Sequence, residues 1–114
     1  MRLAEAAVLA GDHDAALKVA DAAAELGDGA LTPSVQALLH RVRAYAYLQA
    51  GRVPEAEREL ERSLTVARAC DALYEVALSL QASARLRRDA SLAAEARALL
   101  DSLHVVAAPE PPLP

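Results

Sequence analysis

Residue types that bind metals or act as nucleophiles are few in this sequence and lie far apart along it. The three histidines are His13, His40 and His104, and Cys70 is the only cysteine. A metal or catalytic site needs several such side chains to converge at ligand spacing, and this pattern does not provide them. We therefore expect ordinary surface or partly buried histidines, and a small packed thiol at Cys70.

Other signatures of catalysis are also missing from the 114 residues. The sequence has no glycine-rich phosphate loop, no nucleophile elbow and no paired-carboxylate pattern. It therefore predicts a protein that is not an enzyme and that holds no metal or cofactor.

The composition favours a helical domain. Hydrophobic residues make up 54% of the chain and aromatic residues only 3%, so the core must consist of alanine, leucine and valine. Alanine and leucine are the strongest helix formers, which indicates an all-α fold. The single cysteine, together with the lack of a signal-peptide pattern or an apolar run of about 18 residues, predicts a cytoplasmic protein that does not enter a membrane.

The charge balance bears on possible partners. The formal net charge is −4 and the isoelectric point is about 5.3, whereas nucleic-acid binding normally needs a basic surface. We therefore expect no direct contact with nucleic acid. Residues 1–31 hold six acidic and two basic side chains, a local net charge of −4, so the acidic surplus lies in the first third of the chain.

A sequence motif recurs with a period of 40 residues. Residues 11–16, Gly-Asp-His-Asp-Ala-Ala, return at 51–56 as Gly-Arg-Val-Pro-Glu-Ala, and a weaker copy, Ser-Leu-Ala-Ala-Glu-Ala, occupies 91–96. A breaker or cap residue, followed by alanine and then by small or apolar residues at helical spacing, is typical of a helix–turn–helix unit. Three such units at a fixed period predict a stacked array.

Breakers, caps and periodicity together predict six helices. Gly11 and Gly51 should end helices, Thr32 followed by Pro33 should begin one, and Asp71 should cap another. The expected helices cover residues 1–10, 14–26, 33–50, 53–70, 72–87 and 92–103, with Gly27-Asp28-Gly29 as one turn. Residues 1–106 should form one helical repeat domain. The proline-rich residues 107–114 should form a disordered or extended tail that adds no packed backbone.

The middle repeat places small, aromatic, turn-forming and apolar residues in a familiar order: Ala44, Tyr47, Gly51, Ala56, Leu60 and Ser63. With these residues the chain resembles the tetratricopeptide repeat (TPR) family, although the first and third repeats depart from the family pattern. The period of 40 residues exceeds the family's usual one of about 34 residues. In this long period the chain resembles the C-terminal segments of bacterial ATPase- and cyclase-linked transcription regulators. The resemblance implies a TPR-like α-solenoid of about three antiparallel helical hairpins.

In that family the first helix of each pair lines a concave groove, so the resemblance implies a protein–protein interaction or signalling role. On the repeat register the residues that would face the groove are Arg41, Tyr45, Gln49, Gln81, Arg85 and Arg88. Arginine pairs bidentately with carboxylates and tyrosine adds a rigid contact surface, so an acidic peptide or helix is the expected partner. The chain lacks asparagine and therefore does not reproduce the family's carboxylate clamp.

Two other functions remain open: a helical bundle with a structural role in self-association, and a small ligand-binding or enzymatic helical domain. A solenoid should be elongated and a bundle compact. The first helix should have about half the length of its counterparts, and Leu92, Leu99, Leu100 and Leu103 have no following helix to cover them. An uncapped apolar edge favours a homo-oligomer, or packing against other segments of a larger regulator.

Overall fold

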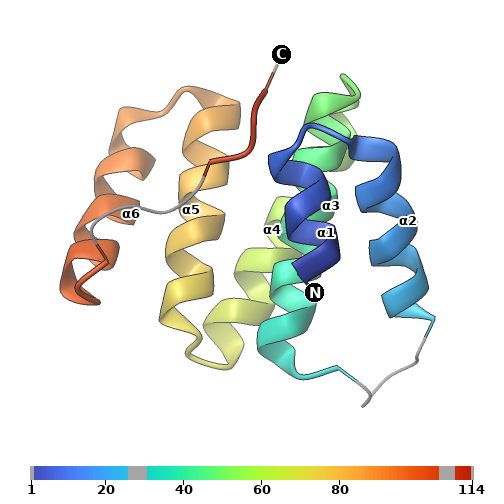
Figure 1. The fold of residues 1–114 in the computed structure, drawn as a ribbon. Helices are drawn as coiled ribbons and strands as arrows, with labels where there is room; N and C mark the ends of the chain where they lie inside the picture. Colours follow the sequence, from blue (N-terminus) through green and yellow to red (C-terminus); the bar gives the residue numbers. More distant parts are fainter. Residues whose placement is uncertain (1, 26–30, 106–109, 114) are drawn as a thin grey trace.

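The computed structural model describes residues 2–25, 31–105 and 110–113 and is helical through most of them (Figure 1). Its helices are α1 (Arg2–Leu9), α2 (His13–Ala24), α3 (Pro33–Gln49), α4 (Val53–Ala69), α5 (Leu73–Arg87) and α6 (Ala90–Ser102). No strand occurs in these ranges, so the all-α fold class is confirmed. None of the described helices combines the length and apolar character needed to cross a membrane. The expected turn at residues 27–29 and the expected helix end at residue 26 lie outside the described residues.

Side chains at the helix starts explain three of the boundaries. The carboxylate of Asp12 and the hydroxyl of Thr32 each accept a hydrogen bond from the amide three residues later, at 3.1 and 3.3 Å, where α2 and α3 begin. Asp89 accepts an equivalent bond of 3.2 Å for α6. Because of this cap, α6 begins at Ala90, two residues before the expected start at residue 92.

The turns use left-handed backbone. Gly11 and Gly51 have φ of +79° and +77°, a conformation that glycine adopts without steric cost. In the third pair Arg88 takes this role with φ of +51°, so Ser91, the expected counterpart of the two glycines, lies inside α6. The expected cap at Asp71 is wrong, because its φ is +52° and α5 begins without a side-chain cap.

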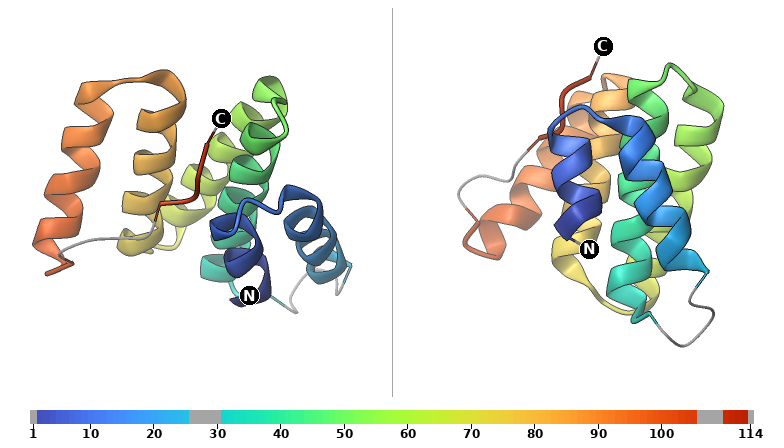
Figure 2. Two further views of the ribbon diagram at one scale, coloured as in Figure 1. Left: turned by 45° about the horizontal axis from the view of Figure 1, so that its top comes forward. Right: turned by 45° about the vertical axis from the view of Figure 1, so that its right-hand side comes forward.

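Each helix packs against its neighbours in sequence, and α3 also contacts α1 and α5. Helix α3 therefore lies beside both α1 and α5, and the last described residues of the chain run between α5 and α1 (Figures 1 and 2). The molecule measures 34 × 32 × 24 Å, so it is not elongated, in contrast to the shape expected of a solenoid.

Alanines spaced 40 residues apart lie where helices approach closely. Ala16 and Ala56 are fully buried in α2 and α4, and Ala96 is 2% exposed in α6. A small side chain at these positions lets two helix backbones come close together without a void. The 40-residue period of the sequence therefore corresponds to equivalent buried positions in the structure.

The apolar face of α6 is better covered than expected. Leu92 and Leu99 pack within the chain against a buried cluster that includes Ala67, Val76 and Leu80. The expectation that the leucines of α6 lack cover is therefore wrong for these two, whereas Leu100 is half-buried and lines a cleft between α5 and α6.

Candidate functional site

The six residues expected to line a groove lie on two neighbouring helices. They are Arg41, Tyr45 and Gln49 on α3, and Gln81, Arg85 and Arg88 on α5 and at its C-terminal end. Residues four apart share a helix face, and α3 contacts α5. Arg85 Nη1 donates a hydrogen bond of 3.4 Å to the Tyr45 hydroxyl, and the guanidinium carbon lies 5.5 Å from the ring centre. We call this region the α3–α5 surface.

Arg41 is the member of this set least able to meet a ligand. Its guanidinium forms an ion pair with the carboxylate of Glu75 on α5, and the two side chains are 8% and 12% exposed. Removing one partner of such a desolvated pair leaves an uncompensated charge, so the pair is costly to break. Arg41 therefore joins α3 to α5, an arrangement that the repeat register does not predict.

Residues 110–113, called the C-terminal segment below, lie on the α3–α5 surface. Gln81 Nε2 donates a hydrogen bond of 2.9 Å to a carboxylate oxygen of Glu110. Gln49 Nε2 donates one of 3.0 Å to the carbonyl oxygen of Pro112 and another of 2.8 Å to the carbonyl oxygen of Val8 on α1. Two of the six expected site residues thus hold the chain's own terminus.

Apolar contacts accompany these hydrogen bonds. Pro111 is buried, and Leu113 packs against the core cluster to which α1 to α5 contribute. The expectation that the tail adds no packed backbone is therefore wrong for residues 110–113. Residues 107–109 and 114 lie outside the described residues.

A small apolar cavity lies beside Pro111. Its volume is about 70 Å³, and its walls include Leu9, Tyr45, Tyr74 and Leu78. Leu9 and Tyr74 are each 42% exposed, among the largest apolar side chains that reach solvent in the described part of the chain. Proline and two tyrosines therefore meet where α1, α3 and α5 come together.

Tyr45 is neutral at this site. Burial raises the pKa of its phenol above the usual value of 10.0, and the hydrogen bond and charge of Arg85 only partly offset that effect. The phenol therefore keeps its proton at physiological pH. Its oxygen accepts from Arg85 and its proton remains available to a hydrogen-bond acceptor.

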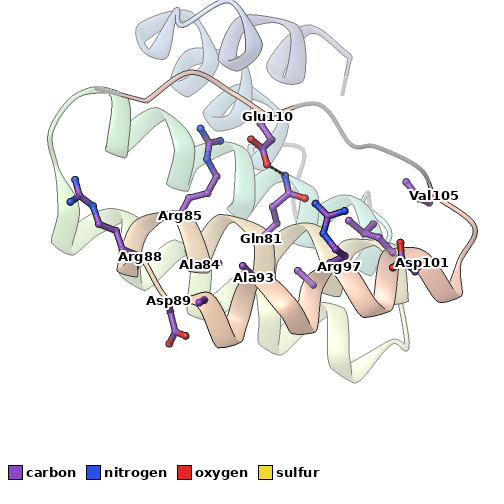
Figure 3. A pocket seen from close by; sticks show the side chains of 13 residues that line it. Gln81, Ala84, Arg85, Arg88, Asp89, Ala93, Arg97, Asp101, Val105 and Glu110 are labelled. Atoms are coloured by element: carbon purple, nitrogen blue, oxygen red, sulfur yellow. Dashed lines mark hydrogen bonds between the residues drawn. The ribbon is translucent and has the colours of Figure 1, made fainter.

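A larger cleft of about 500 Å³ opens between α5 and α6 (Figure 3). Alanine and leucine form its apolar lining, and charged side chains surround them: Ala84, Ala93, Ala96 and Leu100, with Arg85, Arg88, Arg97, Asp89, Asp101 and Glu110. We call it the α5–α6 cleft. Figure 3 shows Glu110 reaching Gln81 at the edge of this cleft, so the C-terminal segment touches both surfaces.

The histidines and the cysteine lie elsewhere. His40 Nδ1 is 2.6 Å from Glu59 on α4, His13 lies beside Asp14 in α2, and Cys70 is exposed rather than packed as expected. Within residues 2–25, 31–105 and 110–113, no three His, Cys, Asp or Glu side chains lie close enough together to hold a metal ion.

Comparison of this chain with known proteins identifies no related protein. No protein family model, curated protein or solved structure matches this chain. The contacts on its own surfaces are therefore the basis for proposing a function.

Three residues of the site were not predicted from the sequence. Glu75 gave no local signal, because its partner lies 34 residues away. Tyr74 could have been found as one of only three tyrosines, next to the start of a helix. Pro111 was visible only as part of a proline-rich run, and such a run alone does not reveal which surface it meets.

Proposed function

We propose that this chain is a non-catalytic protein-interaction module, built as a TPR-like α-solenoid of three antiparallel helical hairpins, which are too few to make the molecule elongated. We propose further that its α3–α5 surface binds extended, proline-containing peptides. The equivalent buried alanines and the sequential packing of the helices support the repeat architecture. The observation that carries the binding role is the C-terminal segment, which lies on this surface as a peptide ligand would.

The contacts of the C-terminal segment combine two kinds of recognition. Gln49 binds a main-chain carbonyl group, which any extended peptide offers. The tyrosine-lined position of Pro111 favours proline, because aromatic grooves recognise the preformed extended conformation of proline-rich segments. Gln81 adds a contact to a carboxylate, which agrees with the expected acidic partner. The ligand we propose is therefore an extended peptide with an acidic residue directly before proline.

The amide oxygen of Gln49 could accept a hydrogen bond from a ligand. Gln49 Oε1 is buried and has no hydrogen-bond partner among the described residues. The Gln49 amide nitrogen donates to two carbonyl oxygens, which fixes the orientation of the amide group. Pro111 and Pro112 have no N–H group to offer. A partner peptide with a residue other than proline near this point would satisfy Gln49 Oε1 and should bind more tightly than the chain's own terminus.

A peptide-binding measurement tests the proposal. The probe is a fluorescein-labelled peptide with the sequence of residues 107–114, and the protein is the full chain carrying Pro111→Asp and Leu113→Asp to undock its own terminus. Fluorescence anisotropy should show binding, and Gln49→Ala should weaken it about fivefold, the effect of one hydrogen bond. Gln36→Ala, near the start of the same helix, is the control. Absence of binding, or an equal effect of the two substitutions, would contradict the proposal.

A further inference from the structure

The helices form three successive pairs, and each pair leaves a slot between its members. α3 contacts both α1 and α2, and α5 contacts both α3 and α4, so the first two slots are each filled by the next helix along the chain. The third slot is the α5–α6 cleft of about 500 Å³. Within the described residues, no further helix occupies it.

Equivalent side chains, 40 residues apart in the sequence, are more buried in the second slot than in the third. At the second slot, Leu48 is 8% exposed and Leu60 is 3% exposed. Their counterparts at the third slot are Arg88, which is exposed, and Leu100, which is half-buried. In the second pair α5 covers these positions, whereas in the third pair the equivalent positions on α5 and α6 are not covered by a described helix.

The charge of the third slot also differs. On the 40-residue register, Tyr45, Leu48 and Glu57 are replaced by Arg85, Arg88 and Arg97. Asp89, Asp101 and Glu110 line the same cleft, but no ion pair joins any of them to these arginines among the described residues. Guanidinium groups in this state can pair with incoming carboxylates.

The filled slot shows where such a carboxylate binds. Glu75 in the first turn of α5 pairs with Arg41 of α3. The counterpart of Arg41 in the third repeat is Gln81, and it donates a hydrogen bond to Glu110. A carboxylate thus meets equivalent positions in both slots, supplied by a helix in one and by the C-terminal segment in the other.

We propose that the α5–α6 cleft binds an acidic amphipathic helix of a partner protein. The helix would pack small apolar side chains against Ala93 and Leu100 and pair its carboxylates with Arg88 and Arg97. Its first-turn acidic residue would compete with Glu110 for Gln81. The α5–α6 cleft shares Gln81 and Arg88 with the α3–α5 surface, but the ligand has a different shape. Gln49 belongs to the peptide site alone, so the two proposals can be tested separately.

The test uses a model helix and the full-length chain. The probe is a fluorescein-labelled, hydrocarbon-stapled helix of about 15 alanine, leucine and glutamate residues, stapled because isolated helices of this length are marginal in water. Anisotropy should show binding that Arg88→Glu with Arg97→Glu weakens about tenfold. Arg87→Glu is the matched control, since Arg87 is exposed at the end of α5 but does not line the cleft. A probe with lysine in place of glutamate should bind the doubly reversed variant better than the parent.

Circular dichroism melts establish that each variant is folded before binding is compared. The proposal is overturned if the acidic helix does not bind, or if Arg87→Glu weakens binding as much as the two cleft substitutions. It is also overturned if sedimentation equilibrium shows a dimer that Arg97→Glu dissociates, because the occupant would then be a second copy of the chain. Gln49→Ala should weaken binding of the peptide probe but not of the helical probe, which separates this site from the peptide site.

Discussion

The hydroxyl oxygens of Ser63 on α4 and Ser79 on α5 lie 2.6 Å apart in the protein interior. Ser63 donates its own proton to the carbonyl oxygen of Ala37 on α3, at 2.8 Å. Ser79 is therefore the donor in the bond between the two serines. Two small polar side chains thus link three helices at a point where both serines are fully buried.

The two buried hydroxyl groups should be energetically coupled, so that removing both lowers the free energy of unfolding by less than the sum of the two single removals. Ser63→Ala leaves the buried Ser79 hydroxyl without its acceptor and removes the side-chain donor to the Ala37 carbonyl, so we expect a loss of about 1 to 3 kcal/mol in the free energy of unfolding. Urea denaturation of Ser63→Ala, Ser79→Ala and the double variant should show a double loss below the sum of the single losses. Ser34→Ala, at an exposed position, is the control. Additive losses would show that the two hydroxyl groups are not coupled.

Ala56 should tolerate no larger side chain. It is fully buried where α4 meets α3, and Ala56→Leu would overpack that contact at a cost of about 1 to 3 kcal/mol. Thermal melts should show the loss, whereas Ala69→Leu at an exposed position of α4 should melt like the parent. Identical melting of the parent and Ala56→Leu would show that this helix contact is assigned wrongly.

Acid should weaken the contact between α3 and α4 through Glu59. Burial acts to raise the pKa of Glu59, but its hydrogen bond to His40 and the charges of His40, Arg43 and Arg62 outweigh burial, so the pKa lies below the usual 4.5. A carboxylate with a lowered pKa stabilises the fold above its unfolded-state pKa, and this contribution disappears as the pH falls through the folded-state pKa.

We therefore expect Glu59→Gln to lower the free energy of unfolding by about 1 kcal/mol at pH 7. The difference from the parent should shrink as the pH falls below 4.5, the usual value for the group. Urea denaturation across pH 3 to 7 measures this difference, with Glu57→Gln on the exposed face of α4 as control. A difference that does not change with pH would mean that the charge of Glu59 is not responsible.

Undocking the C-terminal segment should destabilise the whole chain. Pro111→Asp with Leu113→Asp places charges among apolar side chains of α1, α3 and α5, and we expect a loss of about 1 to 3 kcal/mol. Pro112→Ala is the control, because the Pro112 side chain is exposed. Differential scanning calorimetry compares the melting temperatures. Equal melting of all three proteins would show that the segment adds no stability in solution.

Local chemistry in the sequence was sufficient to predict the helices. Alanine and leucine at helical spacing, the caps at Asp12 and Thr32, and glycine at positions 11 and 51 act over a few residues, so their effects can be read without a fold. The errors arose where two local signals competed. Asp89 and Ser91 could both begin the last helix, and the carboxylate of Asp89 caps it, while Asp71 entered a left-handed turn instead of capping α5.

The site depended on contacts between residues far apart in the chain. The sequence by itself determined that Tyr45 and Gln49 share a helix face and that positions 40 residues apart are equivalent. Only the tertiary structure decided that Arg41 pairs with Glu75 and that Glu110 reaches Gln81. The physical reason is that a charged or polar side chain has many possible partners in an extended chain. The packing of α3 beside α5 selects one of them by bringing it within hydrogen-bond distance.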